Sequence, residues 1–174
     1  MFNIKLKDTS NIADIGIFDN HCRSAVLMRR YSDYNERFKF CFVRNPWERL
    51  ISWFENHKIH FRLPLYKKHT FESWIIAGFP HHWGLQNGTR YKREKRSPLD
   101  QWQFIFDDNN NQLVDFIGHM ETFHDDLTHI FKEINYSLPK IEHKNKSNQE
   151  KNWRSYYNEH TFDLVKRRFH RDIH

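Results

Sequence analysis

The clearest alternation of apolar and polar positions lies in the stretch KFCFVRNPWERLISWF, which begins at Lys39. Residues 39–43 are rich in Phe and Val and predict a buried strand. Directly after it, Asn45 is a favourable helix cap, Pro46 suits the first helical position, and Glu48 stands three residues beyond the cap, as in a capping box. We therefore expect the strand to pass into a helix almost at once.

The predicted helix has one apolar face. Its apolar residues follow the i, i+3, i+4, i+7 spacing of a core stripe: Trp47, Leu50, Ile51 and Phe54. Arg49, Ser52 and Asn56 share the opposite side. The pattern predicts an amphipathic helix whose polar side stays open.

A second strand and helix are predicted further along the chain. The run QFIFDDNNNQLVDFIGHM contains two β-like segments around an Asp-Asn turn, and the second, at 113–118, is apolar enough to lie in the sheet beside 39–43. Thr122 and Asp125 have the spacing of another capping box. The residues after it form a core stripe at helical spacing: Phe123, Leu127, Ile130 and Ile134.

The remaining segments predict shorter helices and loops. Helices are expected near 23–31, at 70–78 with Gly78 as the stop, and in a last amphipathic stretch marked by Phe162, Val165, Phe169 and Ile173. Residues 79–97 and 141–152 read as loops. The charge run RYKREKR in the first loop is either a solvated basic face or a landing site for an acidic acceptor.

The length and the order of elements indicate the fold class. A chain of 174 residues suits one domain, 1–174. Two strand-to-helix units favour a three-layer α/β fold with a mostly parallel sheet, in which ligands lie beyond the carboxyl ends of the strands. The predicted corner at Arg44 is such an end.

Composition narrows the class of partner. The net charge of +6 favours anionic partners. The aromatic residues fall mostly on core stripes and do not interleave with basic residues, which argues against nucleic acid. No apolar stretch is long enough to span a membrane. Two cysteines, Cys22 and Cys41, are too few for a disulfide framework and fit a reducing, cytoplasmic compartment.

The thirteen histidines do not predict a metal site. Two groupings of histidines could act as metal ligands: His57 with His60, and the pair at 81 and 82. Neither has a third ligand at a recognisable spacing. We therefore predict no metal.

The corner at Arg44 is a candidate phosphate clamp. A helix N-terminus carries partial positive charge and attracts a phosphate, to which Arg44 adds a fork of donors and Ser52 a hydroxyl. The alternative is that Arg44 and Arg49 only pair with carboxylates such as Glu48. The residues themselves are compatible with both interpretations, the phosphate clamp and the ion pair.

The motif FVRNPWERLISW closely resembles the 3′-phosphate-binding motif of sulfotransferases that use 3′-phosphoadenosine-5′-phosphosulfate (PAPS), in the branch of carbohydrate sulfotransferases and their bacterial relatives. The run LVDFIGHMETFHDDLTHIFKEI is similar to that family's strand, Gly-x-x-Glu turn and helix. The run NKSNQEKNWRSYYNEHTFDLVKRRFHRDI is similar to its basic loop, Tyr-Tyr segment and closing helix. The likeness runs from about His21 to the C-terminus.

The resemblance implies a P-loop nucleotide-binding type of fold and roles for particular residues. Arg44 and Ser52 would hold the 3′-phosphate of PAPS. Lys146 and Ser147 resemble the loop that closes near the same nucleotide, although an ordinary basic turn is the alternative. His21 lies where relatives carry a His that acts as the base for the acceptor, and a packing or capping role is its alternative.

One part of the family's site is not found in the sequence. The family's 5′-phosphosulfate loop is rich in Gly and carries a Lys, whereas the nearest candidate here, LKDTSN at 6–11, has neither Gly nor Pro. We expect an N-terminally truncated version of the domain. A truncated chain, a fragment completed by another chain and a protein that binds without catalysing are all consistent with this.

The implied function is transfer of a sulfuryl group from PAPS to a hydroxyl of a glycan or small metabolite, with poor or no turnover by this chain as written. The alternative is a non-catalytic module that binds a 3′-phosphorylated nucleotide or an anionic glycan.

Overall fold

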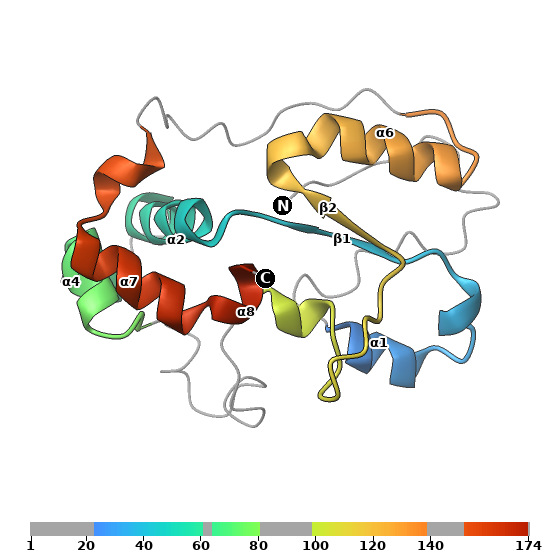
Figure 1. The fold of residues 1–174 in the computed structure, drawn as a ribbon, viewed down its shortest axis with the longest axis horizontal. Coiled ribbons are helices and arrows are strands. Elements are labelled where there is room, and N and C mark those ends of the chain that lie inside the picture. Colours follow the sequence, from blue (N-terminus) through green and yellow to red (C-terminus); the bar gives the residue numbers. More distant parts are fainter. Residues whose placement is uncertain (1–22, 61–63, 81–98, 139–151, 174) are drawn as a thin grey trace. The chain divides into compact units, whose positions relative to one another are not determined.

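The computed structural model describes residues 23–60, 64–80, 99–138 and 152–173 (Figure 1). The chain divides into two compact units. We call Met1–Val43 with Gln103–Lys146 the sheet unit, and Arg44–Trp102 with Ser147–His174 the helical unit. That the two form one domain stays a prediction.

The sheet unit is built on two parallel strands. Strand β1, Phe40–Val43, pairs with β2, Phe116–His119, in a register that sets Phe40 opposite Phe116. The expected parallel neighbours are thus confirmed, and so is a mixed helix and strand fold. All four positions of β1 are half-buried, so the prediction of a buried strand was too strong. Within the described residues the sheet has these two strands, and a three-layer sheet stays a prediction.

Helix α6, Phe123–Glu133, covers the aromatic side chains of this sheet. Leu127, Ile130 and Phe131 are buried, and Phe40, Phe42 and Phe116 pack against them. The apolar stripe predicted for this helix is confirmed, with Phe131 as an additional member. Burial of these side chains is the main force that holds helix and strands together.

The start of α6 differs from the predicted capping box. A 3₁₀ turn, Met120–Thr122, precedes the helix, and Thr122 makes no side-chain cap bond. The Thr122 hydroxyl donates to Asp126 Oδ2 at 2.7 Å, and the His119 N–H donates to the same oxygen at 2.7 Å. These bonds lower the pKa of Asp126. Asp126, and not Asp125, therefore anchors the turn, because its carboxylate can accept from both donors at once.

The segment before β2 forms a turn in place of the predicted first strand. A 3₁₀ helix, Trp102–Phe104, is followed by one antiparallel bridge between Phe106 and Gln112. Asp107 Oδ1 accepts from the N–H groups of Asn109 and Asn111, both at 2.8 Å. Because the Asp107 side chain satisfies these donors, the ladder ends after a single bridge.

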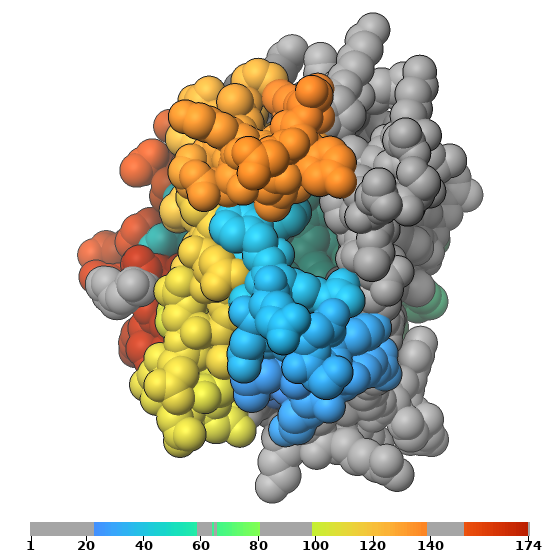
Figure 2. Space-filling model, turned by 90° about the vertical axis from the view of Figure 1, so that its right-hand side faces the viewer, coloured from blue at the N-terminus to red at the C-terminus, as the bar shows by residue number. Residues whose placement is uncertain are grey.

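The N-terminal part of the sheet unit is tied to this turn. It consists of α1, Ser24–Arg30, which was predicted, and a 3₁₀ turn, Tyr34–Glu36. The Ser24 hydroxyl donates to the Phe104 carbonyl, and the Tyr34 hydroxyl donates to the Leu113 carbonyl at 2.7 Å. Figure 2 shows the α1 region (blue) and the turn region (yellow) on one face of the molecule, with α6 in orange.

Cys41, in β1, is a free thiol. Burial raises the pKa of Cys41 to about 12, so the thiol stays protonated at neutral pH. Cys22 lies outside the described residues.

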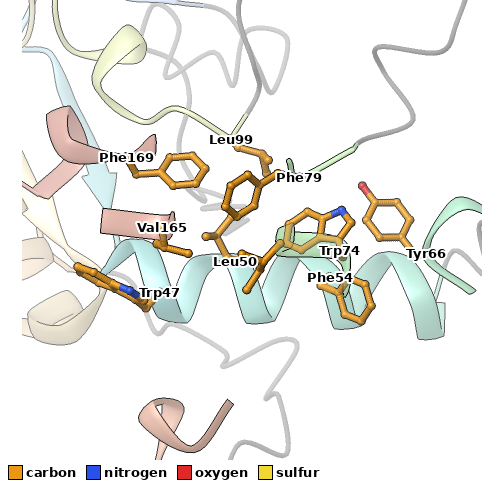
Figure 3. Close-up of a cluster of buried hydrophobic side chains, with 10 residues drawn as sticks. Trp47, Leu50, Phe54, Tyr66, Trp74, Phe79, Leu99, Val165 and Phe169 are labelled. Atoms are coloured by element: carbon orange, nitrogen blue, oxygen red, sulfur yellow. The ribbon is translucent and has the colours of Figure 1, made fainter. Parts of the chain in front are cut away.

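The helical unit contains the second core. Its elements are α2 (Pro46–Glu55), a π-helical turn (Asn56–His60), α3 (Pro64–Lys67), α4 (Phe71–Ile76), a 3₁₀ turn (Trp153–Tyr156), α7 (Glu159–Arg168) and α8 (His170–Ile173). The core is a cluster of large side chains around α2 (Figure 3). All four residues of the predicted α2 stripe are buried, which confirms it. No helix among the described residues is long and apolar enough to cross a membrane.

The ends of the shorter helices follow the sequence signals. Thr70 caps α4 by accepting from the Ser73 N–H at 3.1 Å. Gly78 ends it with a φ of +79°, a conformation that only glycine adopts readily. The predicted last helix is split into α7 and α8 at Phe169, which leaves helical geometry and packs its ring 5.2 Å from Phe79.

We predict that Gly118→Ala destabilises the sheet unit. A Cβ atom at Gly118 would lie 2.6 Å from Cε1 of Phe42, whose ring is held 4.8 Å from that of Phe123. Overpacking of this kind costs about 1–3 kcal/mol, measured as the change in the free energy of unfolding in urea. The control is a double-mutant cycle with Phe42→Leu: the two losses should be clearly less than additive, and additivity would contradict the clash.

We predict that His57 makes the helical unit less stable in acid. His57 is 7% exposed, its Nδ1 bonds to the Trp53 carbonyl at 2.7 Å, and burial lowers its pKa from 6.5. Between the folded and unfolded pKa values the unfolded chain binds more protons, so stability falls as pH drops below 6.5.

The measurement is the urea midpoint as a function of pH for wild type, His57→Gln and His160→Gln, an exposed histidine of α7. His57→Gln should flatten the acid slope, and His160→Gln should leave it steep. Equal slopes in all three proteins would contradict the assignment.

Candidate functional site

The Arg44 corner, residues 44–46 at the start of α2, is built by a helix cap. The Asn45 side chain accepts from the N–H groups of Trp47 at 3.0 Å and Glu48 at 3.4 Å, and Pro46 has no N–H. The first-turn donors are therefore already used. An anion here would be held by side chains and the helix dipole, and not by the unpaired N–H groups that the sequence pattern suggests.

Arg44 is paired with a carboxylate of its own helix. Its Nη2 lies 3.0 Å from Glu48 Oε2, and both side chains are partly exposed, at 25% and 28%. This is the contact expected if Arg44 only pairs with neighbouring carboxylates. Exposed pairs at this spacing contribute about 0.5 kcal/mol, so a dianionic ligand can compete for the guanidinium.

Ser52 lies on the same side of α2 as Glu48, one turn further along. The residue is half-buried, and its hydroxyl makes no hydrogen bond to the described residues. Glu48 and Ser52 lie four residues apart on α2, whereas Arg44 precedes the cap Asn45 and reaches this side of the helix through its pair with Glu48. That Arg44 and Ser52 hold one ligand stays a prediction.

Arg49 braces this part of the unit. Its Nη1 donates to the Leu99 carbonyl at 2.7 Å, and its guanidinium lies 5.8 Å from the centre of the Trp53 ring. Burial lowers the pKa of Arg49, while Asp172 and Asp100 act to raise it. Arg49 therefore joins α2 to the segment at Leu99.

Gln101 holds the backbone of the corner. Its Oε1 accepts from the Arg44 N–H at 2.9 Å, and its Nε2 donates to the Arg44 carbonyl at 2.8 Å. Gln101 is only 7% exposed. A side-chain amide that bonds both polar groups of one residue fixes the backbone from which the Arg44 side chain departs.

Gln101 is in turn fixed by the C-terminal helices. Asp172 accepts from the N–H groups of Gln101 at 3.0 Å and Trp102 at 2.8 Å, and burial raises the pKa of this carboxylate. The neighbouring Asp100 forms a two-bond ion pair with Arg168, at 2.7 and 3.1 Å. The segment 99–102 therefore joins α2 to α7 and α8.

Sequence reasoning did not identify Gln101 or Asp172. Gln101 stands 57 residues from Arg44 and 71 from Asp172 in the chain. Neither belongs to a motif. The sequence contains one weak signal for Asp172. It is a lone acidic residue after the basic run KRRFHR, and a carboxylate that becomes buried needs hydrogen-bond donors.

The other predicted site residues are not placed by the structure. His21, Lys146, Ser147 and the loop candidate at 6–11 lie outside the described residues. No group of three or more His, Cys, Asp or Glu side chains in the described ranges is arranged to hold a metal ion.

Comparison with known families identifies the family of the chain. The family model described as "Sulfotransferase family" matches residues 5–174. This chain belongs to the sulfotransferase family. The resemblance carried by FVRNPWERLISW is confirmed, and the match starts nearer the N-terminus than His21, where we had placed its beginning. Sulfuryl transfer to a hydroxyl-bearing acceptor is the general activity of the family. Neither a curated protein nor a solved structure matches the chain.

We predict that Gln101→Leu destabilises the helical unit of this sulfotransferase-family chain. The substitution keeps the volume but removes both bonds to the Arg44 backbone, which costs about 2–4 kcal/mol of unfolding free energy. The matched control is Gln112→Leu, because exposed Gln112 makes one local bond to Val114 at 2.8 Å. Urea unfolding measures both losses. A loss at position 101 no larger than that at 112 would contradict the role of Gln101 in holding the Arg44 backbone.

Proposed function

We propose that this chain binds the 3′-phosphate of PAPS at the Arg44 corner and transfers the sulfuryl group to a hydroxyl of a glycan or small metabolite. The proposed fold is the three-layer P-loop type, with the corner beyond the carboxyl end of a parallel strand. The observation that carries the proposal is the Arg44 corner: Gln101 holds the Arg44 backbone, the Arg44 side chain lies beside Glu48 in the first turn of α2, and Ser52 stands one turn beyond Glu48.

The chemistry of the corner suits a phosphate dianion. Arg44 offers charged donors in a planar fork on a long side chain, and Ser52, eight residues further along the chain, offers a hydroxyl. We propose that both bond to oxygens of one phosphate. The dipole of the capped ten-residue helix adds partial positive charge. Glu48 opposes binding, and Arg44 must leave it to meet the ligand.

The proposed reaction is a direct displacement at sulfur. The acceptor oxygen forms a bond to sulfur as the bond between sulfur and the 5′-phosphate oxygen breaks, and the electron pair leaves with the product PAP. The acceptor proton passes to a base, for which we propose His21. Lys146 and Ser147 are proposed to close over the nucleotide. Arg44 and Ser52 are proposed to contribute by fixing the nucleotide in line with the acceptor.

One feature favours a second candidate, a non-catalytic module that binds a 3′-phosphorylated nucleotide or an anionic glycan. The segment LKDTSN lacks the glycines that would let backbone N–H groups cradle the 5′-phosphosulfate. Both candidates require binding of PAP, the desulfated product. Only the first requires turnover of PAPS in the presence of an acceptor.

We predict that Arg44 is the main determinant of PAP affinity and Ser52 the second. Charge-assisted bonds contribute about 1.5–3 kcal/mol each, whereas a hydroxyl contributes about 1 kcal/mol. Calorimetric titration with PAP should therefore show about tenfold or greater loss for Arg44→Ala and several-fold loss for Ser52→Ala. Arg44→Lys should recover only part of the affinity, because a point charge cannot form the bidentate fork.

The controls for this series are ATP as ligand and Arg30→Ala as variant, since Arg30 is an exposed arginine of α1. Added salt should reduce the difference between wild type and Arg44→Ala. If both bind PAP equally while circular dichroism shows intact folding, Arg44 is a structural residue and the clamp is wrong.

We predict that Glu48→Gln strengthens PAP binding. The variant removes the carboxylate that lies 3.0 Å from Arg44 Nη2 and repels an incoming phosphate. Removing one charge at about 6 Å from a dianion is worth roughly 1 kcal/mol in water, or about a fivefold gain in affinity at low salt. Glu55→Gln, a carboxylate at the other end of α2, should leave the affinity unchanged. Weaker binding by Glu48→Gln would contradict the competing pair.

A further inference from the structure

We propose that a groove along α7 and α8 binds an acidic sugar residue, a monosaccharide unit that bears a carboxylate or a sulfate. The groove has a volume of about 450 Å³ and is lined by Asp163, Lys166, Arg167, His170 and Ile173. This volume suits a ligand of one or two sugar rings. All five lining residues lie in the helical unit, on one continuous side of α7 and α8.

The cations of this groove differ from the neighbouring cations of the same helices. Arg168 is used by Asp100, at 2.7 Å, and Arg171 lies 3.5 Å above the centre of the Trp102 ring. Lys166 and Arg167 are exposed, and neither forms an ion pair with any carboxylate in the part of the chain that the structure describes. Arg167 Nε donates only to the Asp163 carbonyl, at 3.4 Å.

Two unpaired cations in a hollow favour an anion as ligand. Lys166 and Arg167 occupy adjacent positions in the last turn of α7, so their charges act on the same small volume. The carbonyl groups at the end of the helix offset part of this charge, but they cannot replace a full carboxylate. A carboxylate or sulfate in the groove would receive charge-assisted hydrogen bonds from both side chains.

The other lining residues point to a sugar as the carrier of that anion. The Asp163 carboxylate can accept from a hydroxyl, and it would repel a continuous polyanion such as nucleic acid. His170 Nδ1 lies 3.2 Å from the Arg167 carbonyl, to which it can only donate, so Nε2 is the ring nitrogen that remains for a ligand hydroxyl. Ile173 supplies an apolar contact for the C–H face of a ring. Acceptors, cations and one apolar side chain together match a hydroxylated ring with a single negative group.

The groove is a site of its own, because no residue of the Arg44 corner lines it. Its occupation needs no nucleotide. Binding can therefore be measured without PAPS or PAP, and failure of the phosphate clamp would leave this inference standing.

The test is a titration of the whole isotope-labelled chain, followed by nuclear magnetic resonance of its backbone amides. The probe is galacturonate, a single ring with one carboxylate, and the neutral comparison is galactose, which differs from it only at C6. We expect galacturonate to shift amides of α7 and α8, with saturation, and galactose to bind at least about tenfold more weakly because it lacks the charged group.

Two pairs of substitutions make the test specific. Lys166→Gln with Arg167→Gln should weaken galacturonate binding about tenfold or more. Arg29→Gln with Arg30→Gln is the matched control, since these are also adjacent exposed cations in the last turn of a helix, α1, and the net charge falls equally. Asp163→Asn should lower the preference for galacturonate over inorganic sulfate, because only the sugar offers a hydroxyl to the carboxylate.

Three results would overturn the proposal. The first is equal weakening by the two double variants, which would show a general charge effect. The second is equal affinity for galactose, which would remove the role of the anion. The third is tighter binding of a short single-stranded DNA to the same amides, which would assign the groove to nucleic acid.

Discussion

The pair of hydrogen bonds between the Gln101 amide and the backbone of Arg44 is the constraint on which the helical unit's polar architecture depends. The bonds, at 2.9 and 2.8 Å, form where the chain enters α2. They set the direction of the Arg44 side chain before any ligand arrives. Because Gln101 is itself held by Asp172, the start of α2 and the end of the chain are fixed by one shared residue. Loss of that residue would release both.

The buried polar groups around segment 99–102 cost little free energy of folding, because each has a hydrogen-bond partner. Asp172 is removed from water, which raises its pKa, yet it accepts from two backbone N–H groups and lies near Arg49. Arg49 in turn donates to the Leu99 carbonyl. Breaking such a network leaves a buried charge or donor unsatisfied, which costs more than the net value of any single bond. The segment 99–102 is therefore more rigid than its lack of regular structure suggests.

The sequence predicted what depends on neighbouring residues. The α2 cap at Asn45 and the stripes of α2 and α6 follow from spacing, and the structure contains all of them. The capping box at Thr122 was wrong because two donors, one of them the His119 N–H, converge on Asp126. Gln101 was missed because its role exists only when residues 57 positions apart meet. Local periodicity carries no record of such contacts, so the cap and corner at the start of α2 could be predicted from the sequence, whereas the support that Gln101 gives to Arg44 could not.

The arginines of the helical unit show how a ligand-binding cation differs from a structural one. Arg49 and Arg168 bond to groups that are largely buried, and an incoming anion would have to replace contacts that water cannot restore. Arg44 pairs with a half-exposed carboxylate on its own helix, where water can solvate Glu48 once the guanidinium turns away. The contribution of the Arg44–Glu48 pair itself is therefore small. Charge alone does not separate these three residues, whereas the burial of each partner does, and by this criterion Arg44 is the one that we propose exchanges a carboxylate for a phosphate.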